Sequence, residues 1–333
     1  KKQRSTGHKS GDPTGRSLAV IARLAMILAL TGGTGGAKLV QGLAAAIDPA
    51  DLTIICNTAD DAIFHGLHVS PDIDTIVYTL AGLNDEEKGW GLAGESFVAL
   101  EQLERLGQEV WFKLGDKDLA THILRTSLLR QGLTLSEVTR RIRTALGVKS
   151  EILPMSDDRI ATRIVTANGE MSFQEYFVRE RWSPEVKRVL FAGISQSKPT
   201  PHVLQAIDNA AGIVICPSNP VTSIAPILAV PGVRQALREA RGKIVGVSPI
   251  IGQAAISGPA HTLMRVNDLE PSVNGVAKAY ADFLDMLMID SEDQHLENDI
   301  EQLGVQSVSA NIRMNSLADK QRLARQVLAL FSK

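Results

Sequence analysis

Short apolar runs alternate with segments that carry helix signals from Met26 to the end of the chain. The runs are apolar at every position rather than at alternate ones, which is typical of strands buried on both faces of a parallel sheet. We therefore predict a doubly wound, Rossmann-like α/β fold with a mainly parallel sheet. The predicted strands are residues 26–30, 52–56, 110–112, 189–194, 213–216, 244–247 and 286–289.

Three helix starts stand out between these strands. Ser70 followed by Pro71 places a capping residue before a proline at the first helical position. Thr134-x-x-Glu137 and Ser316-x-x-Asp319 are capping-box patterns, in which a hydroxyl and a carboxylate satisfy each other's backbone donors.

One region interrupts the alternation of strands and helices. Residues 160–166 and 171–177 flank the turn pair Asn168-Gly169, which predicts a β-hairpin. Together with the helical stretches after residue 120, this hairpin indicates an inserted α+β subdomain at about residues 120–186. Residues 26–333 are predicted to form a single α/β catalytic domain that contains this insertion.

Residues 1–25 differ in composition from the rest of the chain. An apolar stretch at 18–30 resembles part of a secretory signal, but Arg23 interrupts it and it is too short to span a bilayer. We predict a disordered basic extension at 1–25. Its basic residues, set against the single acid Asp12, are Lys1, Lys2, Arg4, Lys9, Arg16 and Arg23.

Composition narrows the classes of function. The formal net charge is -2 and 4% of residues are aromatic, which argues against a nucleic-acid partner because such proteins present basic faces or stacking platforms. Cys56 and Cys216 are the only cysteines, and each ends an apolar run. We interpret them as reduced core thiols of a cytoplasmic protein, with no membrane partner.

A glycine-rich turn follows the first predicted strand. It consists of Thr31, Gly32, Gly33, Thr34, Gly35 and Gly36, and such glycines let backbone N–H groups and a helix start face a phosphate. Lys38 is followed by Leu39 rather than by Ser or Thr, which excludes a P-loop. None of the tyrosines is followed four residues later by Lys, which excludes a short-chain dehydrogenase.

Polar residues also follow the other predicted strands. In open parallel sheets the carboxyl ends of the strands share one edge, where ligands bind. We therefore expect these endings to form one site. They are Asn57 to Asp61, Lys113 to Asp116, Pro217 to Pro220, and Ser248-Pro249.

The carboxylates suggest a metal ion. Asp60 with Asp74 is a candidate pair for Mg²⁺, which takes one or two protein carboxylates together with waters and phosphate oxygens. Asp72 and Asp74 alternatively offset the dipole of the helix that begins at Pro71. His65 and His68 are poorer candidates, because no third soft ligand is apparent.

Other polar groups leave two interpretations open. Ser156-Asp157-Asp158 either caps a turn or faces a substrate. Basic residues on the helices, such as Arg140, Arg141 and Arg143, are interpreted as a solvated face, whereas a second set could reach a phosphate: His122, Arg125 and Arg130.

Taken together, these residues resemble the 2-phospho-L-lactate transferase family (CofD/FbiA) of coenzyme F-420 biosynthesis. The resemblance covers the chain from about Met26 onward and leaves only residues 1–25 outside it. It rests on TGGTGGAKLVQGL at 31–43, CNTADD at 56–61, HGLHVSPDIDTIVYTLAG at 65–82, KLGDKDLATHILR at 113–125, LPMSDD at 153–158, PSNPVTSIAPIL at 217–228 and VSPIIGQAAISGPA at 247–260.

The resemblance implies a reaction and a set of roles. A lactyl or enolpyruvyl diphosphoguanosine would donate its phospholactyl or phosphoenolpyruvyl group to the ribityl hydroxyl of the deazaflavin FO, and GMP would leave. Asp74 and Lys113 would contact FO, while Asp60 and Asp74 would hold Mg²⁺. The guanosine diphosphate would lie against Gly32, Gly33, Thr34, Gly35, Gly36, Ser218 and Asn219. A homodimer is the default expectation for assembly.

A second family shares part of this pattern. The nucleotide-sugar-binding regulators of the gluconeogenesis-factor family have the same glycine start and an Ala-Asp-Asp after the second strand. They typically continue with a Gly-Gly-Ser-Ser-Gly type loop. Here the chain continues from Ala62 to Gly66 without it and reaches Pro71-Asp72-Ile73-Asp74, which favours the transferase. Phospholactate and phosphoenolpyruvate donors both remain open.

Overall fold

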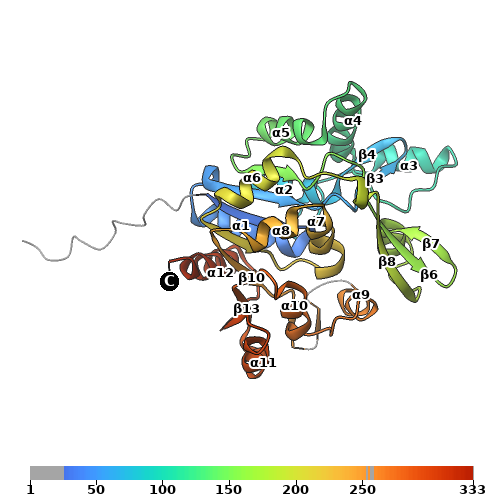
Figure 1. Ribbon diagram of the computed structural model, residues 1–333. Helices are drawn as coiled ribbons and strands as arrows, with labels where there is room; N and C mark the ends of the chain where they lie inside the picture. Colours follow the sequence, from blue (N-terminus) through green and yellow to red (C-terminus); the bar gives the residue numbers. More distant parts are fainter. Residues whose placement is uncertain (1–25, 253, 256–258, 333) are drawn as a thin grey trace, which may run out of the picture.

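The computed structural model describes residues 26–252, 254–255 and 259–332 (Figure 1). The predicted extension at 1–25 lies outside the described residues.

A seven-stranded parallel sheet forms the centre of the molecule. Its strand order is β14-β13-β10-β9-β1-β2-β5, so the chain winds outward from β1 first in one direction and then in the other. This is the doubly wound order of Rossmann-like folds, and it confirms the predicted fold class. The strands are β1 Ile27–Thr31, β2 Leu52–Cys56, β5 Glu151–Pro154, β9 Gly212–Ile215, β10 Lys243–Val247, β13 Met286–Asp290 and β14 Gln306–Ala310.

Five of the seven predicted strands lie in this sheet. The prediction at 110–112 is wrong, because these residues are irregular and Phe112 stacks on Phe64 instead of pairing with a strand. The prediction at 189–194 falls on β8 (Val186–Ala192), which belongs to a separate antiparallel sheet. Two edge strands were not predicted: β14, which carries three polar residues, and β5, a four-residue strand that ends in Pro154.

Helices cover both faces of the sheet. Leu28 and Leu30 contribute to one apolar cluster, and Ile27 and Ala29 to the other, which explains why buried strands read as unbroken apolar runs. One cluster includes side chains of α1 Gly33–Ala46, α2 Pro71–Ala81, α5 Leu135–Ala145 and α12 Leu317–Leu330. The other includes side chains of α6 Pro201–Asn209, α7 Ala225–Ala229, α8 Val233–Arg238, α9 Ala260–Val266, α10 Val273–Tyr280 and α11 Glu297–Glu301.

Shorter elements complete the fold. Two hairpins are β3 Ala62–Phe64 with β4 Leu67–Val69, and β11 Ile250–Ile251 with β12 Ala254–Ala255. The remaining helices are α3 Val98–Arg105, α4 Asp116–Arg130, the 3-10 turns η1 Pro49–Asp51, η3 Ile194–Gln196 and η5 Ser291–Leu296, and the π-type turns η2 Glu175–Arg179 and η4 Pro220–Ile224.

The predicted helix starts are confirmed. Both capping boxes form, at Thr134 with Glu137 and at Ser316 with Asp319. Helix α2 begins at Pro71, but the Ser70 hydroxyl donates to Asp61 instead of capping the helix.

A three-stranded antiparallel sheet stands beside the main sheet, at the lower right of Figure 1. The predicted hairpin is present as β6 (Ala161–Thr166) and β7 (Gly169–Ser172), and β8 pairs with the other edge of β6. The strand β7 is shorter than predicted because the chain turns into η2. The predicted insertion at 120–186 contains β5, a strand of the main sheet, so the boundary of a separate subdomain remains a prediction.

Both cysteines are free and buried. Burial raises the pKa of the Cys56 thiol well above its ordinary value and that of Cys216 to about 12. Within the described part of the chain, no helix combines the length and the apolar character that crossing a membrane requires.

Candidate functional site

The candidate site lies where the strand order reverses, between β1 and β9. Gly32 follows β1, and its N–H donates to Ser218 Oγ (3.3 Å) beyond β9. Gly33 begins α1 with a φ of 67°, and its N–H donates to Asp72 Oδ1 (2.8 Å). The glycine turn is therefore tied on one side to the loop after β9 and on the other to the start of α2.

Close packing explains why this turn needs glycine. A Cβ atom on Gly35 would lie 2.5 Å from the backbone oxygen of Pro217. One on Gly36 would lie 1.9 Å from Thr31 Oγ1, and one on Gly32 would lie 2.7 Å from Asp72 Oδ2. Any larger residue at these positions would push the glycine turn away from the neighbouring loops.

A cavity of about 450 Å³ opens over the glycine turn. It brings together most of the predicted site residues: Gly32, Gly33, Thr34, Gly35, Asp60, Lys113, Ser218 and Asn219. The far wall comes from the segment that follows β7, with Phe173, Gln174, Phe177, Val178 and Arg181. Gly36 and Asp74 are not on the cavity wall.

Two buried carboxylates face each other at the floor of this cavity. The amide Nδ2 of Asn57 donates to Asp60 Oδ2 (3.2 Å) and to Asp72 Oδ2 (2.9 Å). Burial, followed by the charge of Asp72, raises the pKa of Asp60. Burial also raises the pKa of Asp72 to about 6. Within the described residues, Asp60 Oδ1 has no hydrogen-bond partner, so it is available to a cation or a substrate donor.

Asp74 occupies a different environment from the one that the sequence suggested. Both of its carboxylate oxygens accept hydrogen bonds from Arg125, which is fully buried. His122 Nδ1 lies 3.7 Å from Asp74 Oδ2, and His122 Nε2 lies 3.2 Å from Asp118 Oδ2. The carboxylate that faces Asp60 is thus that of Asp72, whereas Asp74 is neutralised by Arg125.

This second cluster also has the composition of a metal site. Asp74, Asp118 and His122 each bring one ligand atom within 4.8 Å of the others. However, the Arg125 guanidinium already supplies positive charge and contacts both Asp74 and His122 Nδ1 (3.2 Å). A further cation would be repelled by this guanidinium, so the Asp60–Asp72 pair is the better candidate.

The interpretation of His122 and Arg125 as phosphate ligands is wrong, because both are buried and bound to Asp74 or its neighbours. Arg130 donates to the Gly66 carbonyl oxygen (3.3 Å). Asp157 accepts from the Ser136 N–H and hydroxyl, both at 2.8 Å. Asp157 therefore binds the first turn of α5, and the choice between a turn and a substrate contact for Ser156-Asp157-Asp158 stays a prediction.

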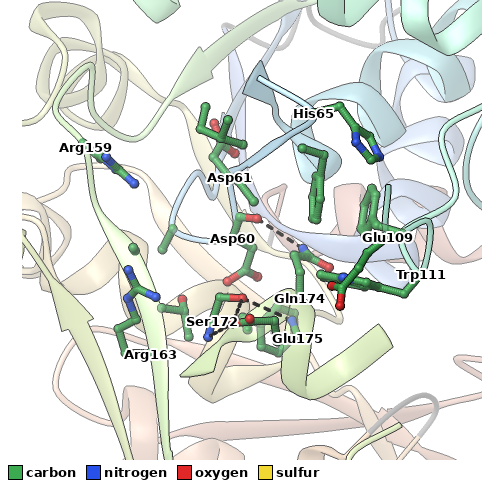
Figure 2. Close-up of a pocket in the computed structure, with 18 of the residues that line it drawn as sticks. Asp60, Asp61, His65, Glu109, Trp111, Arg159, Arg163, Ser172, Gln174 and Glu175 are labelled. Atoms are coloured by element: carbon green, nitrogen blue, oxygen red, sulfur yellow. Dashed lines mark hydrogen bonds between the residues drawn. The ribbon is translucent and has the colours of Figure 1, made fainter. Parts of the chain in front are cut away.

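A second cavity of about 580 Å³ adjoins the first (Figure 2). The two share part of their walls: Asp60, Trp111, Phe112, Phe173 and Gln174. Figure 2 shows Arg159 and Arg163 on one side, Glu109 and Trp111 on the other, and Asp60 between them. Asp60 therefore stands where the two cavities meet.

Aromatic rings form one side of this second cavity. Phe64 and Phe112 are stacked with ring centroids 3.9 Å apart, and Trp111 meets Phe64 edge to face at 5.3 Å. Because residues 110–112 were predicted to form a strand, this cluster was not predicted. The consecutive aromatic pair Trp111-Phe112, in a chain with few aromatic residues, was the available signal.

Gln174 and Arg181 were not predicted as site residues. The helix-dipole role of Asp72 was one of two alternatives, and in the structure its carboxylate accepts from both Asn57 and Gly33. Gln174 Nε2 donates to the backbone oxygen of Asp60 (3.2 Å) and so connects the two sheets at the site.

Comparison with known proteins gives a consistent result. The family model described as 2-phospho-L-lactate transferase CofD matches residues 27–329. A 2-phospho-L-lactate transferase from Methanosarcina mazei is 40% identical over 92% of this chain and 100% of its own length. A phosphoenolpyruvate transferase from Streptomyces griseus is 42% identical over 91% of this chain and 98% of its own length.

Among solved structures, a protein from Bacillus halodurans described as a member of the upf0052 family superposes with a TM-score of 0.61. The alignment covers 91% of this chain and 98% of that one, at 17% sequence identity. At this identity the similarity concerns the fold alone.

Proposed function

Because this chain belongs to the 2-phospho-L-lactate transferase CofD family, we propose that it transfers a phospholactyl or phosphoenolpyruvyl group to the deazaflavin FO. The donor is the corresponding lactyl or enolpyruvyl diphosphoguanosine, and GMP is the second product. The observation that carries this proposal is the meeting of two cavities at Asp60, one beside a glycine turn and one beside aromatic rings.

The first cavity suits the donor. The N–H groups of Gly32 and Gly33 already donate to Ser218 and Asp72, so an anion such as a diphosphate would be received by the following N–H groups at the start of α1. Asn219 accepts from Val221 and Thr222 N–H through its Oδ1, which leaves its amide Nδ2 to donate to the ligand. Lys113 adds a compact positive charge on the same wall.

The second cavity suits the acceptor. A deazaflavin presents a planar ring system, and aromatic side chains stack favourably on such rings. With the ring against Trp111 and Phe112, the ribityl chain would extend past Asp60 toward the donor. Asp74 would need to exchange its Arg125 partner to contact FO, so that predicted contact stays a prediction.

The Asp60–Asp72 pair fits a divalent cation. Two buried carboxylates with raised pKa values repel each other, and Asp60 Oδ1 lacks a partner within the described chain. Oxygen ligands of this kind match Mg²⁺. Asp60 and Asp72 would hold the ion, and it would neutralise the charge of the donor diphosphate.

The chain's own residues then act by position and charge. The ribityl hydroxyl oxygen attacks the outer phosphorus and gives its proton to Asp60, the bond from that phosphorus to the bridging oxygen breaks, and GMP leaves with that oxygen. Asp60 would also orient the hydroxyl by accepting its hydrogen bond before attack, and Lys113 would offset the charge that builds on the transferring phosphate. Such transfer depends mainly on positioning and electrostatic stabilisation.

The test is a defined reaction. Purified protein, FO and Mg²⁺ are incubated with lactyl- or enolpyruvyl-diphosphoguanosine, and the products are identified by mass. We expect a phosphodiester of FO and one equivalent of GMP from at least one donor, and no product in excess EDTA. Binding of a nucleotide sugar with no turnover of either donor would contradict the proposal and favour a regulator.

A further inference from the structure

Arg181 and Trp182 adopt an unusual backbone conformation. Both have a φ of 49°, in the left-handed region that residues with a side chain seldom adopt. Each such residue costs on the order of 1 kcal/mol and persists only when its surroundings hold it. The turn lies between η2 and β8, at the edge of the first cavity.

Contacts other than those of Arg181 hold this turn in place. The Trp182 N–H donates to the Tyr176 backbone oxygen (2.9 Å), and Tyr176 is fully buried. The Ser183 N–H donates to the Glu180 backbone oxygen (3.0 Å), and the rings of Phe177 and Trp182 lie 5.2 Å apart. These contacts hold the strained turn in place, and the turn positions Arg181 at the first cavity.

That side chain lines the first cavity. Arg181 and Lys113 are the two basic residues on its described wall, and the glycine turn and the Asp60–Asp72 pair belong to the same wall. Two other arginines of the three-stranded unit are ion-paired, Arg163 with Glu170 and Arg179 with Glu109. Arg181 forms no such pair within the part of the chain that the structure describes.

We propose that Arg181 is a donor-binding residue that receives an oxyanion of the nucleotide conjugate, either its carboxylate or its outer phosphate. This inference rests on the proposed function. A guanidinium presents two parallel N–H donors, which match a carboxylate or a phosphate better than an ammonium does. The strained turn is retained because it directs this fork into the cavity.

The experiment compares Arg181→Gln, Arg181→Lys and Arg181→Gly with Arg188→Gln, a matched control. Arg188 is exposed on β8 of the same unit and does not line the cavity. We expect Arg181→Gln to raise the KM for the donor about 10- to 100-fold and to leave the KM for FO within about twofold. Arg181→Lys should recover part of the loss, and Arg188→Gln should match the wild type.

Arg181→Gly separates binding from folding. Glycine adopts the left-handed conformation without strain. The Tm of the Arg181→Gly variant should therefore equal or exceed that of the wild type, while donor binding is lost. Calorimetry with GDP, which lacks the carboxylic acid, distinguishes the two oxyanions. Weaker GDP binding in Arg181→Gln assigns a phosphate, and unchanged GDP binding with weaker binding of the full donor assigns the carboxylate.

Two results would overturn the inference. One is a donor KM within twofold of wild type in Arg181→Gln. The other is a fall in the Tm of Arg181→Gly that accounts for its lost activity. Failure of the wild-type protein to bind GDP or either donor would instead refute the proposed function, so the two failures are distinguishable.

Discussion

Asp60 and Asp72 place two buried carboxylates within reach of one amide nitrogen, and this arrangement links stability to pH. Their pKa values are raised in the folded protein, that of Asp72 to about 6, whereas an unfolded aspartate titrates near 3.9. Where both carboxylates are ionised, their charges oppose folding. As the pH falls through 6, the folded state takes up a proton first, so this penalty is relieved.

Asp60→Asn should therefore raise the Tm by about 2 °C or more at pH 8, and this gain should shrink toward pH 5. Asparagine can still accept the hydrogen bond from Asn57. Thermal unfolding across pH 5 to 8 measures the effect, and activity should fall at least 100-fold. Added Mg²⁺ should stabilise the wild type but not the variant. An equal Tm difference at every pH would contradict the assigned charge repulsion.

A substitution at Asp74 should have the opposite effect on stability, because Asp74 is ion-paired with Arg125. In Asp74→Asn the fully buried guanidinium loses its counter-charge, which should cost about 3 kcal/mol of stability. GDP affinity should change little, because the carboxylate is not on the wall of the first cavity. Thermal unfolding and calorimetry measure the two effects, with the exposed Asp299→Asn as control. A Tm equal to wild type would show that Arg125 finds another partner.

Asp72 lines the first cavity and Asp74 does not, a difference that the local sequence pattern does not predict. Both residues lie in the first turn of α2, two positions apart, so their side chains point to nearly opposite sides of the helix. Which side meets the site depends on how α2 packs on α1 and α4. That information comes from tertiary contacts and not from the local pattern.

At the scale of elements, helix starts were predictable because capping is local. The Thr134 hydroxyl accepts from the Glu137 N–H (3.2 Å), and the Glu137 carboxylate accepts from the Thr134 N–H (2.9 Å). Thr134→Ala should cost about 1 kcal/mol and lower the Tm by about 2 °C. Thr144→Ala, exposed in the same helix, is the control for helix propensity. Differential scanning calorimetry compares the two, and an equal Tm would mean that α5 needs no cap.

Strands were predictable only where both faces are buried. The edge strand β14 carries Gln306, Ser307 and Ser309, so its pattern lacks the apolar signal of the inner strands. The run at 110–112 is apolar like the inner strands, but its side chains form an aromatic cluster instead of a strand. A hydrophobic run therefore reports burial more reliably than it reports the type of element.

At the scale of the whole molecule, the topology of the sheet explains why predicted site residues that are distant in sequence line one cavity. The carboxyl ends of parallel strands meet at one edge whatever the details of their packing, so the glycine turn, Asp60 and Ser218 were correctly placed together. The opposite wall was not predictable. It depends on how the three-stranded sheet docks, and no local pattern encodes that docking.

The two buried cysteines allow local unfolding of the central sheet to be measured by thiol alkylation. Thiol reagents attack the thiolate, and neither Cys56 nor Cys216 forms one readily near neutral pH while it stays buried. They end β2 and follow β9, the two strands that flank β1. Alkylation therefore counts only molecules in which the centre of the sheet has separated. The alkylation rate of the native protein therefore measures how often the sheet opens. The same low thiolate content makes the folded protein insensitive to mild oxidants.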